Sequence, residues 1–166
     1  MSNPQFQVDV LNDSGWPVEG ERLARAARTV LGLYGPPSGC ALTVVIDDDA
    51  AVAALNRQFR GVDAPTDVLS FPADQPPVEL DGEPRYLGDL VIAFPYASTQ
   101  AAREGHALMD SLALLVVHGT LHLLGYDHGD ADARSAMWAA QEAALIALGL
   151  SPDLVPALEF GPHNHG

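Results

Sequence analysis

Lysine is absent from this chain of 166 residues, and all eight of its basic residues are arginine. The 22 acidic residues leave a formal charge of −14 at pH 7, so the chain lacks the broad positive field that holds nucleic acid by bulk attraction. An anionic partner would have to be held by a metal ion or by a few placed arginines. The planar guanidinium suits that role because it can grip phosphate in two places.

Cysteine is almost absent as well: Cys40 is the only one, so no internal disulfide can form. Residues 1–13 contain neither the basic nor the apolar region of a secretory signal. No apolar run reaches the roughly 18 residues that a membrane span requires, because Asp110, His118 and His122 interrupt the longest one. We therefore expect a cytoplasmic protein that does not engage a membrane.

Hydrophobic residues make up 48% of the chain, which predicts a globular fold. Short β-branched or alternating segments predict strands at 6–13, 40–48, 65–71 and 87–95, and a proline-rich acidic stretch predicts a surface loop at 72–86. Periodic segments predict helices at 17–35, 47–61, 97–103, 108–124 and 132–148. This order favours an α+β fold, one small sheet packed with helices. Residues 1–154 are predicted to form a single domain, followed by a loose C-terminal tail at 155–166.

The segment His118–His128, HGTLHLLGYDH, holds three of the six histidines and follows an almost wholly apolar stretch, SLALLVV. His118 and His122 are four residues apart, so on a helix they project from one face, with the spacing at which two imidazoles share a metal ion. A third ligand eight residues along the same helix would lie about 12 Å further along its axis, too far to share a metal ion whose bonds to nitrogen are about 2 Å long. Gly125 is expected to end the helix and let the chain return His128 to the same point.

Three histidine ligands favour a catalytic zinc site at the end of a buried helix, because they leave a fourth coordination position open. Such an ion would lower the pKa of a bound water toward about 7. Nickel, copper or another divalent ion would also accept three imidazoles, so the pattern indicates one metal ion per chain without fixing its identity. A metalloprotease is disfavoured, since Gly119 stands where the protease motif places its glutamate base. That glycine either leaves space for a substrate or lets a neighbouring element pack closely.

HGTLHLLGYDH resembles the HGxLHLxGYDH signature of the YbeY family, metal-dependent endoribonucleases of bacterial ribosomal RNA maturation. Two more segments are similar to family blocks: LNRQFRGVDAPTDVLSFP, residues 55–72, to LNxxyRgxdxpTDVLSFP, and LGDLVIA, residues 87–93, to LGDIvI. The resemblance implies a mixed sheet flanked by helices and a zinc ion on His118, His122 and His128. It also implies a nuclease that prefers single-stranded RNA and acts in small-subunit (16S) ribosomal RNA maturation and ribosome quality control.

The resemblance also places Arg60 near the active cleft, where it would stabilise charge developing on a phosphate. The other interpretation of Arg60 is a helix-terminal arginine paired with Asp63 or Asp67. Aspartates could orient a ligand histidine or a water, and polar residues of the 65–71 segment could shape its turn and strand start. The residues considered for such positioning roles are Asp67, Ser70, Asp89 and Asp127.

Two other functions stay open at this point. One is a ribosome-associated RNA-binding factor in which the metal is structural, and the other is a zinc hydrolase of a non-RNA substrate. The expected partners are single-stranded RNA or pre-ribosomal small-subunit RNA, together with ribosomal small-subunit proteins or assembly factors. Either water or a ribose hydroxyl could attack the phosphodiester.

Overall fold

Four strands pair into one mixed sheet in the computed structural model, which describes residues 5–73 and 85–154. The strands lie in the order β1-β2-β4-β3, with β1, β2 and β4 parallel and β3 antiparallel to β4. Their bounds are Phe6–Leu11 for β1, Cys40–Asp47 for β2, Val68–Pro72 for β3 and Arg85–Ala93 for β4. The predicted α+β fold with a small mixed sheet is confirmed. The expected tail at 155–166 and residues 74–84 of the expected loop lie outside the described residues.

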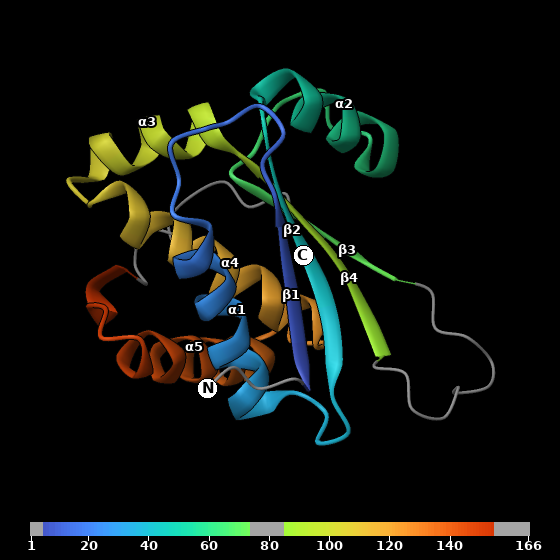
Figure 1. The fold of residues 1–166 in the computed structure, drawn as a ribbon, viewed down its shortest axis with the longest axis vertical. Coiled ribbons are helices and arrows are strands. Elements are labelled where there is room, and N and C mark those ends of the chain that lie inside the picture. Colours follow the sequence, from blue (N-terminus) through green and yellow to red (C-terminus); the bar gives the residue numbers. More distant parts are fainter. Residues whose placement is uncertain (1–4, 74–84, 155–166) are drawn as a thin grey trace.

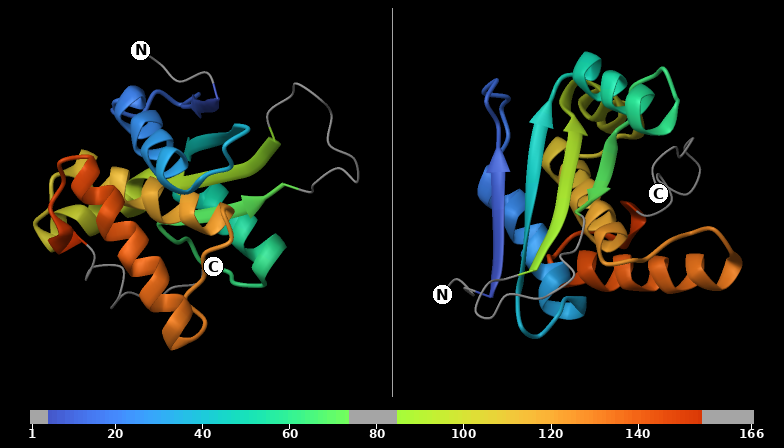
Figure 2. Two further views of the ribbon diagram at one scale, coloured as in Figure 1. Left: turned by 90° about the horizontal axis from the view of Figure 1, so that it is seen from below. Right: turned by 90° about the vertical axis from the view of Figure 1, so that its right-hand side faces the viewer.

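Helices α1 and α4 pack on one face of the sheet, which we call the inner face, and α5 packs on these two helices. Helix α2 lies at one end of the other, outer face (Figure 1). Figure 2 (right) shows the four strands side by side, with α1 and α4 packed behind them. The helices are α1 (Gly20–Tyr34), α2 (Asp49–Arg60), α3 (Phe94–Glu104), α4 (Leu108–Leu123) and α5 (Ala131–Ala147), with a short 3₁₀ turn at Pro152–Leu154.

Helix α4 is the centre of the core. It contacts α1, α3 and α5 as well as β3 and β4. A helix that is apolar on nearly all sides needs neighbours on all sides, and 112–117 of α4 are all buried. The sequence SLALLVV therefore specifies burial, and the histidines that follow it are carried into the same protected environment.

Helix α3 begins earlier than predicted. The strand expected to end at Pro95 ends at Ala93, and α3 starts at Phe94, with the proline in its first turn. Proline is well tolerated at that position, because the first N–H groups of a helix have no partner within it and the proline φ angle already suits a helix. The prediction treated Pro95 as a strand end, so it placed the helix start three residues late.

Within the described residues, no single helix has both the length and the apolar composition to cross a membrane. Helices α3 and α4 pass that test only when taken together, and the chain bends by 116° between them.

Candidate metal centre

Two imidazoles lie in the last turns of α4 and meet edge to face. The Nε2 atoms of His118 and His122 are 3.1 Å apart, and the ring centroids are 4.7 Å apart. His118 is fully buried and His122 is half-buried. The four-residue spacing thus gives the shared face that the sequence predicted, with both ring edges pointing to one place.

Gly125 ends α4, as expected from the sequence. Its φ of 101° is a conformation that favours glycine. The N–H of Gly125 donates to the His122 carbonyl, and the N–H of Tyr126 donates to the Leu121 carbonyl, both at 3.0 Å. This pair of bonds is the Schellman arrangement, which reverses the chain after a helix.

The reversal carries His128 back to the other two histidines. The ligand atoms of all three side chains lie within 4.8 Å of one another, and the group could hold a metal ion. A tetrahedral zinc site with Zn–N bonds of about 2.0–2.1 Å separates its nitrogens by about 3.4 Å. The 3.1 Å between the first two Nε2 atoms is close to that separation.

The hydrogen bonds of the rings decide which nitrogen faces the centre. His122 Nδ1 lies 3.0 Å from the Tyr126 carbonyl oxygen, and His118 Nδ1 lies 2.9 Å from Gln141 Oε1. Both oxygens can only accept, so both Nδ1 atoms carry the proton and both Nε2 atoms present a lone pair. Two lone pairs that face each other at 3.1 Å repel unless a cation lies between them. The donor set therefore fits a metal ion.

The protonation of His122 agrees with this arrangement. Burial lowers the pKa of His122 to about 4, and the nearby charge of His128 adds to the decrease. The hydrogen bond to Tyr126 and the charge of Asp127 act in the opposite direction, and Arg60 lowers the pKa slightly further. At neutral pH the imidazole is therefore uncharged, which is the form that binds metals.

Helix α5 supplies two residues that sequence reasoning missed. Gln141, fully buried, accepts the His118 Nδ1–H bond, and Trp138 lies against His118 and His128 with centroids 5.9 and 6.1 Å away. Together they fix the orientation of two of the three rings. The available signal was a glutamine on a helix face that is otherwise buried and apolar at Met137, Ala140, Ala144 and Leu145.

Gly119 brings α4 close to the sheet. A Cβ at this position would lie 2.7 Å from Leu90 Cδ2 and 3.3 Å from Ser70 Oγ. Ser70 lies opposite Leu90 on β3 and points to the same inner face, where its Oγ is 3.4 Å from the Gly119 carbonyl oxygen. The sequence left two explanations for a glycine at position 119, space for a substrate or close packing of a neighbouring element. The contacts support close packing. Ser70 anchors the strand to the helical turn that carries the histidines.

Arg60 is the last residue of α2 and is half-buried. Gly61, with a φ of 72°, ends the helix, and the buried side chain of Asn56 donates a 2.8 Å bond to the Ala64 carbonyl in the loop that follows. Partial burial lowers the pKa of Arg60, which still stays protonated at neutral pH. The positive charge of Arg60 is the smallest of the effects that lower the pKa of His122, and its role at the histidines stays a prediction.

Asp67 is buried just before β3. Its Oδ1 accepts a 2.7 Å bond from the Val68 N–H and a 3.3 Å bond from the Thr66 hydroxyl. Burial raises the pKa of Asp67 to about 6, against the effect of these hydrogen bonds, and the charge of Glu104 adds to the increase. These local bonds hold the turn that leads into the strand.

The other two aspartates are placed differently from what the sequence suggested. Asp89 neighbours the inward-facing Leu90, so it points to the outer face, where the Tyr86 hydroxyl contacts both its carboxylate and the Thr43 hydroxyl. The structure does not bring Asp89 to the histidines. Asp127 lies beside them but is exposed, and its Oδ1 accepts a 2.7 Å bond from the His128 backbone N–H rather than from an imidazole.

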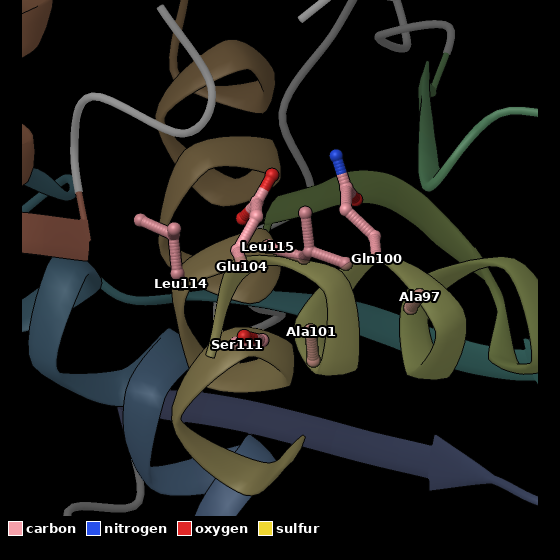
Figure 3. A pocket seen from close by; sticks show the side chains of 7 residues that line it. All are labelled: Ala97, Gln100, Ala101, Glu104, Ser111, Leu114 and Leu115. Atoms are coloured by element: carbon pink, nitrogen blue, oxygen red, sulfur yellow. The ribbon is translucent and has the colours of Figure 1, made fainter. Parts of the chain in front are cut away.

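A small pocket lies along the same stripe of α4, between that helix and α3 (Figure 3). Ser111 and Leu115, two turns and one turn before His118, line it from α4, and Gln100 and Glu104 line it from α3. Its volume of 10 Å³ is about that of one water molecule. The pocket has no room for a nucleotide, and none of the three histidines lines it.

A family model described as "Endoribonuclease YbeY" matches residues 12–149, which include all three histidines and Arg60. The chain belongs to the YbeY endoribonuclease family. The YbeY endoribonuclease of Chloroflexus aggregans is 47% identical over 150 residues, covering 87% of this chain and 97% of the relative. That of Moorella thermoacetica is 45% identical, covering 81% and 92%.

A solved structure shows the same fold. The solution structure of TM1509 from Thermotoga maritima aligns with a TM-score of 0.59 and 22% identity, covering 94% of this chain and 98% of that one. Membership of the YbeY family identifies the chain as an endoribonuclease, a hydrolase whose substrate is RNA. The histidine group that could hold a metal ion thus lies in the matched domain of a nuclease.

Proposed function

We propose that this YbeY-family endoribonuclease depends on one zinc ion held by His118, His122 and His128. We further propose that it cuts single-stranded RNA in the maturation of small-subunit (16S) ribosomal RNA and in ribosome quality control. The observation that carries the metal is the pair of Nε2 atoms 3.1 Å apart, with the third histidine returned to them by the turn at Gly125. Nickel or another divalent ion would fit the same donors.

The chain's own residues have separable tasks. Gln141 and the Tyr126 carbonyl hold two imidazoles in the tautomer that presents Nε2. A divalent ion bound there would supply Lewis acidity for phosphodiester hydrolysis. The Arg60 guanidinium would bind the scissile phosphate and stabilise the negative charge that develops on it. Ser70 and Asp67 act by fixing β3 and the turn before it, and Asp127 by fixing the turn at His128.

The preference for single strands follows from charge and access. A chain with a net charge of −14 repels the dense phosphates of a duplex, whereas a single strand can place one phosphate at a local arginine. Acting on ribosomal RNA in the cytoplasm, the protein would receive its substrate within a pre-ribosomal particle. Small-subunit ribosomal proteins or assembly factors would then help to present the RNA.

The test is RNA cleavage by highly purified, metal-loaded protein. We expect single-stranded oligonucleotides to be cut faster than duplexes, with activity lost to a chelator and restored by added zinc. Arg60→Glu should lower the rate by roughly 10²–10³-fold without loss of metal. Arg25→Glu, the same charge change at an exposed position of α1, is the control and should stay near the parent rate. A parent protein that binds pre-ribosomal particles but cuts no RNA would instead be a binding factor.

A further inference from the structure

Phe59 lies in the last turn of α2, next to Arg60, with 59% of its surface exposed. A single exposed apolar residue is ordinary, but this ring is held in place. It packs edge to face against Phe71 of β3, with the ring centroids 5.3 Å apart and the planes at 66°. A ring that is fixed by one neighbour and otherwise open can receive another flat group at little cost in side-chain entropy.

Two arginines in the same turn of α2 distinguish this ring from other exposed apolar residues. On α1, Arg22 lies 3.1 Å from Asp110, and Arg28 is paired with Glu21. Arg57, one turn before Arg60 on α2 and exposed, has no ion pair with any residue that the structure describes. In a lysine-free chain, an exposed aromatic ring in the same helical turn as two arginines is suited to a base and its phosphates.

Two neighbouring residues of β3 connect the ring on one face of the sheet with the histidine-bearing turn of α4 on the other. Phe71 points to the outer face of β3, which is an edge strand, and the preceding residue, Ser70, points to the inner face. The Ser70 Oγ is 3.4 Å from the carbonyl oxygen of Gly119, the residue after His118. Arg60 follows Phe59 in the chain and acts electrostatically on His122. RNA that crosses the β3 edge from the histidines would therefore pass the arginine and reach the ring.

We propose that the Phe59 ring stacks against one base of the single-stranded RNA substrate, while Arg57 and Arg60 contact the phosphates beside that base. The proposal rests on the proposed function and adds to it a nucleotide-binding site outside the metal centre. It also explains how so acidic a chain can hold RNA. Affinity comes from stacking and two local charges rather than from a broad positive surface.

The test is the affinity of the full-length, metal-loaded protein for a fluorescently labelled single-stranded RNA, measured by anisotropy. Phe59→Ala should weaken binding by roughly 5- to 150-fold, the range for loss of one base–aromatic stack, and Phe59→Trp should retain it. Ile146→Ala is the matched control, because Ile146 on α5 is 58% exposed and should not affect binding. Arg57→Gln should weaken binding and reduce its salt dependence by about one phosphate contact.

A second arm uses oligonucleotides in which a single abasic residue is moved along the strand. In the parent, one abasic position should reduce affinity by the same factor as Phe59→Ala, and in Phe59→Ala that position should have no further effect. If Phe59→Ala fails to fold, the abasic series with the parent and with Phe59→Trp decides the matter.

The outcomes separate the two proposals. A parent that neither binds nor cuts single-stranded RNA would overturn the proposed function. The stacking site alone would be overturned if Phe59→Ala bound RNA as tightly as the parent and if every abasic position reduced the affinity of the parent equally. Unchanged RNA affinity together with lost binding to a ribosomal particle would assign the ring to a protein contact and would also overturn it.

Discussion

Two glycines in helices of this protein should respond in opposite ways to the same substitution. Gly32 lies in the last turn of α1, where an added Cβ would meet no atom within 4 Å. Gly119 lies inside α4, where the added Cβ would come within 2.7 Å of Leu90 Cδ2 and 3.2 Å of Leu90 Cδ1. Leu90 is fully buried, so its side chain has little room to move away.

The magnitudes follow from these contacts. Replacing glycine by alanine in an exposed helix is worth up to about 1 kcal/mol, so Gly32→Ala should raise the free energy of unfolding by that amount. Gly119→Ala gains the same helix propensity but forces α4 away from β4, at an overpacking cost of about 1–3 kcal/mol. Its net effect should be a loss of up to about 2 kcal/mol. Both are measured by urea unfolding.

In thermal unfolding, about 1 kcal/mol corresponds to roughly 2–4 °C in Tm for a chain of this size. Gly32→Ala should therefore raise Tm by about 2–4 °C, and Gly119→Ala should lower it by up to about 8 °C. Gly119→Ala should also weaken metal binding, because moving α4 shifts two imidazoles relative to His128. An equal rise in Tm for the two variants, with unchanged metal affinity, would refute the close packing of α4 on the sheet.

Two further substitutions test the buried polar groups. The folded pKa of Asp67, about 6, lies above the ordinary 3.8, so the folded state holds this proton more tightly. Stability should therefore fall by roughly 3 kcal/mol as pH rises from about 4 to above 6, and urea unfolding of Asp67→Asn should lack this part of the pH dependence. A parallel pH dependence in both proteins would contradict the assignment. Gln141→Ala should lower metal affinity by roughly 10–100-fold and change the His118 tautomer seen by ¹⁵N NMR, whereas the exposed Glu142→Ala should do neither. An unchanged tautomer in Gln141→Ala would remove the positioning role.

The histidine cluster was predictable because its geometry is local. A four-residue spacing on a helix, a glycine just after it and a third histidine three residues later lie within eleven residues. Helical periodicity and the conformational freedom of Gly125 are enough to bring them together. The burial of α4 was also predictable from a local segment, because a helix that is apolar on all sides has to be surrounded by other elements.

The contacts that support the cluster are distant in sequence and were not predictable. Gln141 is 23 residues from His118, and Ser70 is 49 residues from Gly119. The outer-face position of Asp89 was not predictable either. Strand alternation shows that neighbouring residues face opposite sides, but not which side the helices will cover. That choice depends on how α1 and α4 pack on the finished sheet, and no short motif encodes it.

Metal content measured by mass spectrometry tests the histidine centre most directly. The protein should be purified without an affinity tag and with His163 and His165 replaced by asparagine, so that histidines near the C-terminus cannot contribute. We expect about one zinc or other divalent ion per chain, and its loss in His122→Ala, with the fold retained by circular dichroism. Retention of a full equivalent of metal in His122→Ala would show that the three imidazoles are not its ligands.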